Sequence, residues 1–356
     1  MSGARVELHH SLHQLPPLPT EEADFLKRIR RRFFSFPNVL AFENLKGEYS
    51  PMNGNDVNTL LQALPYMRHH NGATFVVKCG GEIARDATSL DGLSRDLALC
   101  IHVGIRIVLV HGGGPQASEL SERLGMEPVK VAGRRITDHE TLEVAKMVFG
   151  GSINIDILSA LRRHGLQAVG LSGVDGGIVH AVKRPPTMVD DPESGGKREV
   201  DFGLVGDITA VNVGLLQYLI SGGYVPVVSS LGGDDAGHVF NINADTVAAQ
   251  VAVALKAHKL VMLTDAPGLM ANFPDPASLV RHITVPGCEQ LLHDGKITGG
   301  MVPKVETLLV AVRGGVPRAH ILDGKTPHAL LLELFTKDGA GTMVTSREEE
   351  KRYLGE

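Results

Sequence analysis

Two apolar segments of this chain end in clusters of glycines, and this pattern restricts the possible folds more than any other feature. One runs from Phe75 to Gly81 as Phe-Val-Val-Lys-Cys-Gly-Gly, and the other from Ile107 to Gly114 as Ile-Val-Leu-Val-His-Gly-Gly-Gly. A short apolar run bounded by glycine is typical of a buried parallel strand. Because glycine leaves backbone N–H groups uncovered, and a following helix adds its positive end, such turns can bind an anion such as phosphate.

The glycine pattern differs from the two common phosphate-binding fingerprints. These turns fit neither Gly-x-x-x-x-Gly-Lys-Ser/Thr nor Gly-x-Gly-x-x-Gly. For a single turn, the backbone freedom of glycine is a sufficient explanation. Two turns with Lys78 at the same sheet edge favour an anion site, because ligands of parallel sheets bind at the carboxyl ends of the strands.

Strand-like and helix-like segments alternate through most of the chain. We expect strands at 74–78, 105–110, 167–171, 225–228, 259–263 and 319–322, and helices at 56–72, 88–103, from Pro115, and at 138–149, 152–164 and 244–257, with Asp56 as the first N-cap. The stretch 185–196 is rich in proline, glycine and acidic residues and predicts an exposed loop. The alternation predicts an α/β fold, a three-layer αβα sandwich with a mainly parallel central sheet in two lobes.

The same analysis divides the chain into five segments. They are an N-terminal appendage (1–53), an N-terminal helix (54–72), an N-lobe (73–200), a C-lobe (201–346) and a C-terminal tail (347–356).

Composition excludes several classes of protein. The net charge is −5, aromatic residues make up 4% and tryptophan is absent, so we expect no nucleic-acid interface. No stretch approaches the roughly 20 apolar residues of a membrane span, so no membrane association is expected, and three cysteines that cannot all pair favour a cytoplasmic location. There are 16 histidines, but no histidines or cysteines recur at metal-ligand spacing, so we expect no metal site in the protein.

Two further clusters add polar groups to the glycine turns. Asn241-Ile242-Asn243-Ala244-Asp245 puts three polar side chains where capping of the following helix needs only one. Gly299-Gly300-Met301-Val302-Pro303-Lys304 puts a lysine in the first turn of a helix, where the helix dipole disfavours a cation unless an anion binds nearby. An unpartnered surface lysine is the simpler alternative for Lys304. Two lysines, one aspartate and glycine N–H donors are the parts that phosphoryl transfer needs, because it depends on positioning and charge neutralisation.

Seven motifs follow one another in a family-specific order between about residue 56 and residue 344. They are Lys78-Cys79-Gly80-Gly81, His111-Gly112-Gly113-Gly114-Pro115-Gln116, Gly133-Arg134-Arg135-Ile136-Thr137-Asp138, Gly203-Leu204-Val205-Gly206-Asp207, Asn241-Ile242-Asn243-Ala244-Asp245, Leu263-Thr264-Asp265 and Gly299-Gly300-Met301-Val302-Pro303-Lys304. In these motifs the chain resembles the amino-acid kinase superfamily, and within it the arginine-sensitive N-acetylglutamate kinases.

This resemblance implies an enzyme that uses ATP, brought as its Mg²⁺ complex, to phosphorylate N-acetyl-L-glutamate to N-acetyl-L-glutamyl 5-phosphate in arginine biosynthesis. The N-lobe is thereby assigned to the acyl amino acid and the C-lobe to ATP. The implied catalytic residues are Lys78, Lys304 and Asp245; the implied substrate-binding residues are Gly113, Gly114, Arg135, Asn241 and Asn243; the implied ATP-binding residues are Gly80, Gly81, Thr264, Asp265, Gly268, Gly300 and Met301.

Segments near the C-terminus resemble the chain segments that bind the feedback inhibitor L-arginine in the arginine-sensitive members of that family. The implied inhibitor contacts are Tyr66, His320, Glu333 and Gly339. The N-terminal helix implies a homo-oligomer, either a dimer or a hexamer built from dimers. From periodicity alone, an ordinary amphipathic helix and strand explain Glu333 and His320 equally well.

The chain departs from the family pattern at three places. Cys79 replaces an aromatic or aliphatic residue, 150–155 lacks two lysines common in that segment, and Val174 stands where lysine is frequent.

Two alternative functions are a kinase for an aminoadipate derivative in lysine biosynthesis and a catalytically silent arginine-binding module. The arginine-site residues disfavour the first, and the presence of both lysines and Asp245 disfavours the second.

Overall fold

The structure is a computed structural model, and it describes residues 54–127, 129–131, 134–191 and 196–354. The chain divides into two compact units, Met1–Pro51 and Met52–Glu356, and all of the described residues belong to the second. The expectations for the appendage 1–53 and for Gly133 therefore lie outside the described residues. The lobe boundary near residue 200 stays a prediction.

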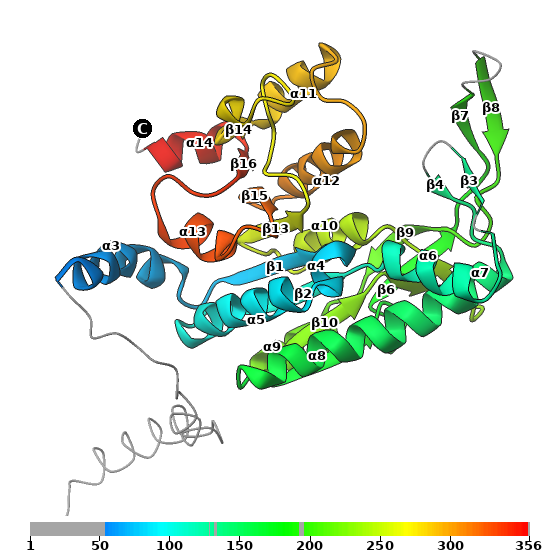
Figure 1. The fold of residues 1–356 in the computed structure, drawn as a ribbon, viewed down its shortest axis with the longest axis horizontal. Helices are drawn as coiled ribbons and strands as arrows, with labels where there is room; N and C mark the ends of the chain where they lie inside the picture. The colour runs from blue at the N-terminus through cyan, green and yellow to red at the C-terminus, as the bar shows by residue number, and fades with distance from the viewer. Residues whose placement is uncertain (1–53, 128, 132–133, 192–195, 355–356) are drawn as a thin grey trace, which may run out of the picture. The chain divides into compact units, whose positions relative to one another are not determined.

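An eight-stranded sheet forms the centre of the fold (Figure 1). Its strands lie in the order β14 (His282–Thr284), β16 (Thr342–Thr345), β15 (Arg318–Asp323), β13 (Lys259–Thr264), β1 (Thr74–Cys79), β2 (Arg106–His111), β10 (Val225–Ser229) and β5 (Ala168–Ser172). Neighbouring strands run parallel except β15 and β16. All six strands expected from the sequence are present in this sheet, so the mainly parallel α/β architecture is confirmed.

A smaller sheet and two hairpins add strands that the sequence did not predict. The smaller sheet has the order β12 (Val239–Asn241), β11 (Leu231–Gly233), β6 (Val179–Lys183) and β9 (Gly206–Val211). The hairpins are β3 (Lys130–Val131) with β4 (Arg134–Arg135), and β7 (Thr187–Asp191) with β8 (Gly196–Val200). Figure 1 shows β7 and β8 projecting away from the central sheet.

The exposed loop expected at 185–196 is wrong, because most of this stretch belongs to the β7–β8 hairpin. Val189 and Val200 are buried together with Phe202, and Val131 packs against them. Every second side chain of a strand faces the same side of the hairpin. Buried valines on one side of the two strands can therefore pack together and stabilise the hairpin. This packing outweighs the proline and glycine content on which the loop expectation rested.

Helices connect the strands. They are α3 (Gly54–His70), α4 (Gly81–Arg85), α5 (Ala87–His102), α6 (Gly114–Arg123), α7 (His139–Ala145), α8 (Ile153–Arg163), α9 (Gly214–Ser221), α10 (Ala244–Ala254), α11 (Val285–His293), α12 (Met301–Arg313), α13 (Ala329–Phe335) and α14 (Arg347–Leu354). Because α3 already begins at Gly54, the expectation that Asp56 is its N-cap is wrong. Gly72 follows the helix with a φ of 78°, a left-handed conformation that glycine adopts without strain.

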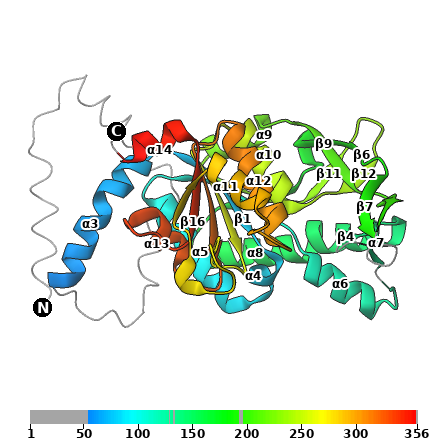
Figure 2. The same cartoon turned by 90° about the horizontal axis from the view of Figure 1, so that it is seen from above.

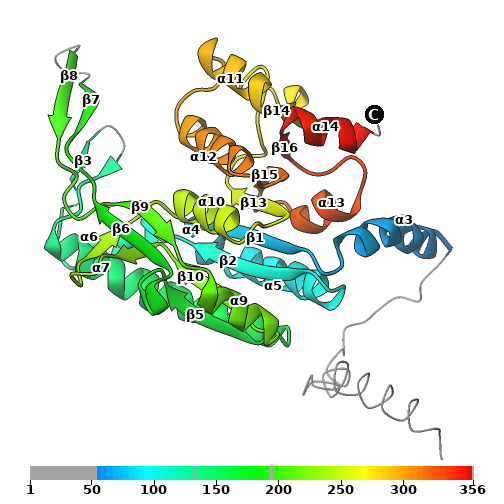
Figure 3. The same cartoon turned by 180° about the vertical axis from the view of Figure 1, so that it is seen from behind.

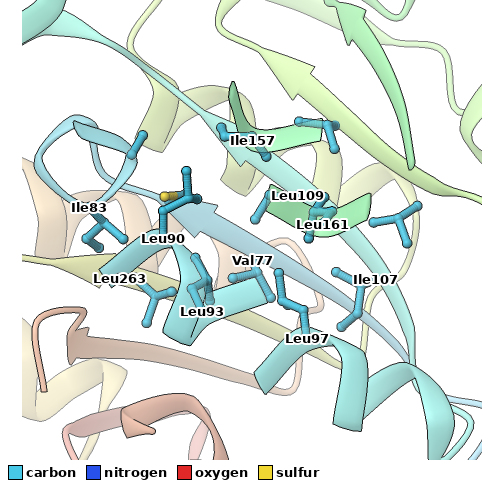
Figure 4. Packing of buried hydrophobic residues seen from close by; sticks show 14 of the residues in the cluster. Val77, Ile83, Leu90, Leu93, Leu97, Ile107, Leu109, Ile157, Leu161 and Leu263 are labelled. Carbon is cyan, nitrogen blue, oxygen red and sulfur yellow. The ribbon is translucent and has the colours of Figure 1, made fainter. Parts of the chain in front are cut away.

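The helices cover both faces of the central sheet (Figure 2), and Figure 3 shows the same layers from behind. Side chains of a strand point alternately to the two faces. In β1, Phe75 and Val77 therefore belong to a cluster with α5 and α8, whereas Val76 belongs to a cluster with α10 and α12. Figure 4 shows the first cluster, in which Val77 and Leu109 pack near Leu93. The expected three-layer αβα sandwich is thus confirmed.

The segment His139–Arg163 forms one helical run instead of the two separate helices that were expected. A π-helix, η3 (Lys146–Ser152), joins α7 to α8 across Gly150 and Gly151. By length and composition alone this run could cross a membrane, contrary to the expectation that no stretch approaches that length. Half of its most apolar window is buried inside the protein, where Phe149 and Ile157 belong to the core. Core packing therefore accounts for its apolar character.

A buried polar contact ties this helical run to β2. His111 is fully buried, and burial lowers its pKa to about 4, so the ring is neutral at pH 7. Its Nδ1 lies 3.0 Å from the Gly112 carbonyl oxygen and its Nε2 lies 3.1 Å from Nδ2 of Asn154. The neutral ring thus donates from Nδ1 and accepts at Nε2. Asn154 also lies 3.3 Å from the carbonyl oxygens of Leu171 and Val227, so it links three strands.

We expect Asn154→Ala to lower the free energy of unfolding by about 2 kcal/mol, because His111 Nε2 and two carbonyl groups lose a buried donor. Urea unfolding followed by circular dichroism measures this change. Gln217→Ala on the exposed side of α9 is the matched control and should change stability by less than about 0.5 kcal/mol. Equal effects of the two substitutions would show that the buried contact is not needed for stability.

Candidate active site

The carboxyl ends of four neighbouring strands meet at one edge of the central sheet. Strand register pairs Cys79 with both His111 and Leu263, and pairs His111 with Ser229. Because strands in this register end together, the glycine turn after β1 lies beside the glycine turn after β2. The two turns from which an anion site was predicted are therefore neighbours.

The two glycine turns are in direct contact. A Cβ atom at Gly81 would lie 2.9 Å from Cδ of Pro115 and 3.5 Å from Cα of Gly113, so a side chain has no room there. Gln116, a motif residue without an assigned role, donates from Nε2 to the Gly81 carbonyl oxygen at 2.8 Å. Among the described residues, no side chain caps α4 or α6, the helices that begin at these turns. Their first N–H groups therefore remain available to a ligand.

Lys78, Asp245 and Lys304 meet beside these turns, although they come from β1, α10 and α12. Lys78 Nζ lies 2.8 Å from Asp245 Oδ1, and Lys304 Nζ lies 3.6 Å from Asp245 Oδ2. Lys78 and Asp245 are each only 8% exposed. Lys78 Nζ is also 3.9 Å from the position that a Cβ at Gly80 would take. The structure thus brings the three residues that were implied to be catalytic into one cluster.

The two lysines control the charge of Asp245. Burial alone would raise the pKa of this carboxyl, because an ion loses hydration in the interior. The ammonium groups of Lys78 and Lys304 outweigh burial and hold the pKa of Asp245 below its usual value. With one carboxylate for two ammonium groups, the cluster has a net positive charge beside uncovered N–H groups. This arrangement suits a polyanionic ligand.

The three polar residues before and in α10 have three different roles. Asn243 caps the helix, since its Oδ1 accepts from the Asp245 N–H at 2.7 Å. Asn241 instead donates from Nδ2 to Thr137 Oγ1 at 3.2 Å. Helix capping therefore explains Asn243 only, while Asp245 holds the lysines.

A cavity of about 1180 Å³ is lined by chain neighbours of the lysine cluster, among them Thr246 and Pro303, but not by Lys78, Asp245 or Lys304. Its lining includes Arg135, Asn241, Asn243 and Gly300, which come from both substrate and ATP sets implied by the sequence. Arg135 donates to Gly114 O at 3.4 Å and to the hydroxyl oxygen of Ser118. Burial lowers the pKa of this guanidinium, which stays charged at neutral pH. A half-buried guanidinium on a cavity wall is suited to bind a carboxylate through two hydrogen bonds.

Sequence reasoning missed one charged pair in this cavity. Arg184 lies 2.8 Å (Nε) and 2.7 Å (Nη2) from Asp207 Oδ1, and both residues line the cavity. Asp207 belonged to a recognised motif but had no assigned role. Arg184 gave no signal, because its contact depends on the pairing of β6 with β9.

Thr264, Asp265 and Gly268 form a turn after β13 at the same sheet edge. Thr264 Oγ1 donates to Asp265 Oδ1 at 3.1 Å and accepts from the Ala266 N–H at 3.0 Å. Gly268 has a φ of 143°, and a Cβ there would lie 2.5 Å from Thr342 Oγ1, so only glycine fits. These residues do not line the cavity that contains Arg135. Of the remaining implied ATP contacts, Gly300 is the N-cap of α12 and Met301 is its first residue.

A second, smaller cavity brings together all four residues that were implied to contact an inhibitor: Tyr66, His320, Glu333 and Gly339. Glu333 Oε1 lies 2.7 Å from His320 Nδ1, and Oε2 accepts from Ala340 N at 2.6 Å and from Gly341 N at 3.1 Å. Burial opposes ionisation of Glu333, but the hydrogen bond from His320 and these N–H groups lower its pKa to about 2. Burial lowers the pKa of His320 to about 4, so a neutral ring donates to a carboxylate.

Lys259 is the residue of this cavity that sequence reasoning missed. It is 5% exposed, lines the cavity, and has its Nζ 5.9 Å from the centre of the Phe75 ring. Burial and the nearby Arg318 lower the pKa of Lys259 to about 7. Within the described part of the chain it forms no ion pair at 4.0 Å or less. A lysine at the start of an otherwise apolar strand was a signal, but it had no assigned role. With a pKa near 7, the buried side chain of Lys259 readily gains or loses its proton at neutral pH. An anionic ligand group in this cavity would favour the ammonium form, so the lysine points to such a ligand.

Comparison with known proteins identifies related chains. The model of the amino acid kinase family matches residues 73–323. The acetylglutamate kinase of Methanothermobacter thermautotrophicus is 44% identical over 289 residues, which cover 81% of this chain and 99% of the relative. The acetylglutamate kinase of Methanocaldococcus jannaschii is 46% identical over 286 residues, covering 80% and 95%.

Solved structures share the fold. N-acetylglutamate synthase from Neisseria gonorrhoeae, complexed with coenzyme A and N-acetylglutamate, superimposes with a TM-score of 0.69 at 28% identity; the match covers 82% of this chain and only 63% of that chain. Carbamate kinase from Giardia superimposes with a TM-score of 0.56 at 17% identity over 77% of this chain and 99% of the other. The similarity to carbamate kinase shows a shared fold and nothing more.

The buried histidines predict a loss of stability in mild acid. His111 and His320 each have a pKa of about 4 in the folded chain against an ordinary 6.5. Because the folded pKa is the lower one, the unfolded chain takes up these protons first, so stability is complete above pH 6.5 and falls as the pH drops toward 4. Urea unfolding between pH 6.5 and pH 5 measures how the free energy of unfolding changes with pH. We expect this slope to be smaller in His320→Gln than in wild type by about 1 kcal/mol per pH unit.

The exposed His293 provides the control, since His293→Gln should leave the slope unchanged. Parallel curves for wild type and His320→Gln would mean that His320 is not held neutral by burial. Because the comparison uses slopes, it does not depend on how far His320→Gln lowers stability at neutral pH.

Proposed function

The chain belongs to the amino acid kinase family, and from this premise we propose that it transfers the γ-phosphoryl group of ATP to the γ-carboxylate of N-acetyl-L-glutamate. A carboxylate oxygen forms the new bond to the γ-phosphorus, the bond from that phosphorus to the β-bridging oxygen breaks, and ADP leaves. No proton needs to move. The product, N-acetyl-L-glutamyl 5-phosphate, is an intermediate of arginine biosynthesis.

The observation that carries this proposal is the cluster of Lys78, Asp245 and Lys304 beside two glycine turns. Phosphoryl transfer spreads negative charge over the oxygens of the transferred group, so it is accelerated mainly by fixed positive charges and N–H donors. In our proposal Lys78 and Lys304 stabilise that charge from two sides, and Asp245 keeps them in place. The N–H groups of Gly80, Gly81 and Gly113 hold the phosphates.

The acyl amino acid is assigned to the cavity lined by Arg135. There the guanidinium of Arg135 pairs with the α-carboxylate, while Asn241 and Asn243 bind the remaining polar groups and Gly114 lies at the turn. Thr264, Asp265, Gly268, Gly300 and Met301 are assigned to the nucleotide.

Magnesium is assigned to the nucleotide and not to a protein site. Among the described residues there is no group of three or more His, Cys, Asp or Glu side chains that could hold a metal ion, and Asp245 is engaged by two lysines. Mg²⁺ prefers to keep several waters and to bind substrate phosphates. When bound with ATP, it neutralises phosphate charge.

We further assign the smaller cavity to L-arginine as feedback inhibitor. An amino acid with a cationic side chain needs an anionic and a cationic group in the site, and the cavity offers Glu333 and the unpaired ammonium of Lys259. Tyr66 of α3, His320 and Gly339 complete the lining. In this assignment Glu333 faces the guanidinium and Lys259 faces the carboxylate.

The assembly we propose is a homo-oligomer, either a dimer or a hexamer built from dimers. Strand β5 ends the central sheet, and Met147 and Ile155 of the adjacent helical run are 54% and 61% exposed. Leu60 and Leu61 of α3 are likewise exposed. Apolar side chains of this kind favour contact with further copies of the chain.

The three free cysteines, all buried, agree with a cytoplasmic location.

The proposed reaction is tested by coupled measurement of ADP release with N-acetylglutamate. We expect Lys78→Ala and Lys304→Ala to lower kcat at least about 100-fold with a smaller change in KM, because each removes a charge that acts on the transferred group. Lys183→Ala, which removes only an exposed ion pair with Asp201, is the control and should keep wild-type rates. Near-wild-type turnover in Lys78→Ala and Lys304→Ala would contradict the catalytic role proposed for these two lysines.

The same assay separates the substrate from its longer homologue. One methylene is worth about 1–3 kcal/mol in a pocket, so kcat/KM for N-acetylaminoadipate should be at least about tenfold lower. A preference for the longer substrate would instead assign the chain to the aminoadipate reaction.

The inhibitor assignment predicts that millimolar L-arginine inhibits the wild-type enzyme and that Glu333→Ala abolishes this inhibition. The substitution removes the carboxylate that contacts His320 in this cavity, so a guanidinium loses its partner. Glu140→Ala on the exposed face of α7 serves as the control and should remain inhibited. Wild-type activity that is indifferent to arginine would disprove the regulatory assignment and leave the catalytic one intact.

A further inference from the structure

The C-terminal helix α14 contributes carboxylates that contact lining residues of the cavity around Lys259. Glu349 Oε1 lies 2.9 Å from both Nε and Nη2 of Arg318, a cavity-lining residue of β15, and the two side chains are only 13% and 18% exposed. The neighbouring Glu350 lies 3.7 Å from His282, which also lines the cavity. A segment that the sequence assigned to a C-terminal tail therefore contacts the wall of this cavity, although no residue of α14 lines it.

Local sequence fixes the position of Glu349. Ser346 directly precedes the helix. Its Oγ accepts from the Glu349 N–H at 3.1 Å, and its carbonyl oxygen accepts from the Glu350 N–H at 3.0 Å. Three glutamates follow in the first turn, where carboxylates interact favourably with the helix dipole. Of these, Glu348 points to solvent, whereas Glu349 and Glu350 are partly buried. Helix geometry thus selects one carboxylate for Arg318.

The cavity has an excess of positive charge without this carboxylate. Its lining contains four basic side chains, Lys259, Arg281, Arg318 and Lys337, against two carboxylates, Glu333 and Asp338. Of these carboxylates, Glu333 is already engaged by His320 and two N–H groups. Such a site repels a ligand whose side chain is a cation. Glu349 offsets Arg318, and together with Glu333 it raises the pKa of Lys259 against the effect of burial. Glu349 therefore both lowers the net charge of the cavity and helps Lys259 to keep its proton.

We propose that Glu349 is a specificity-determining residue of this cavity: by neutralising Arg318, it allows a site with a buried ammonium group to accept an amino acid with a cationic side chain. This inference rests on the proposed regulatory role of the cavity. It assigns to α14 the function of setting the charge preference of the inhibitor site, apart from any role in holding β14, β15 and β16 together.

Isothermal titration of the full chain with L-arginine tests the proposal. We expect Glu349→Gln to weaken arginine binding at least about fivefold, the size expected when one charge is removed near a partly buried site. Glu348→Gln is the matched control, since it changes the same charge one position away on the exposed side, and it should bind within about twofold of wild type.

A second variant separates charge from structure. Arg318→Gln combined with Glu349→Gln removes the pair and leaves the net charge unchanged, so it should recover arginine binding to within about threefold of wild type. If Glu349→Gln binds like wild type, or if the double variant is folded by circular dichroism and does not recover binding, Glu349 does not act through its charge on Arg318. If wild type itself gives no binding, the proposed regulatory function fails as well.

Discussion

The carboxylate of Asp245 between the ammonium groups of Lys78 and Lys304 is the interaction on which the rest of the active site depends. Two lysines at a buried sheet edge repel each other and lose hydration, and one ionised carboxylate offsets both effects. The fold serves this contact. Strand β1 delivers Lys78, while α10 and α12 pack on the same face of the sheet and deliver Asp245 and Lys304. The register of β1 and β2 then puts two glycine turns beside the resulting positive charge.

The same strands carry a second charged site at their other ends. Lys259 begins β13 and Thr264 ends it, and Arg318 begins β15. Six residues of strand span roughly 17 Å, so the cavity around Lys259 and the turn at Thr264 lie at opposite ends of the strands of one sheet. Both sites combine buried lysines with a carboxylate whose pKa is held low. The two sites differ in the group that balances their remaining positive charge. We assign this role to the phosphates of the ligand beside Lys78 and Lys304, and to Glu349 beside Lys259.

The sequence predicted those parts of the fold that depend on local pattern. Apolar runs, two of them ending in glycine clusters, identified six strands of the central sheet, and the motifs named Lys78, Asp245 and Lys304. Features decided by distant contacts were missed or wrong. The β7–β8 hairpin depends on burial of Val189, Val200 and Phe202. Where two separate helices were expected, α7 and α8 are joined through a π-helix. Lys259 became informative only when its burial and lack of an ion pair were known.

A double-mutant cycle on kcat tests the central claim most directly. If Asp245 acts by holding the lysines, Asp245→Asn and Lys304→Ala remove the same arrangement, and the double variant should be little slower than the slower single variant. Wild type, both single variants and the double variant are compared in one ADP-release assay at saturating substrates. Losses in kcat that multiply in the double variant would show that Asp245 and Lys304 act independently, and would contradict the account.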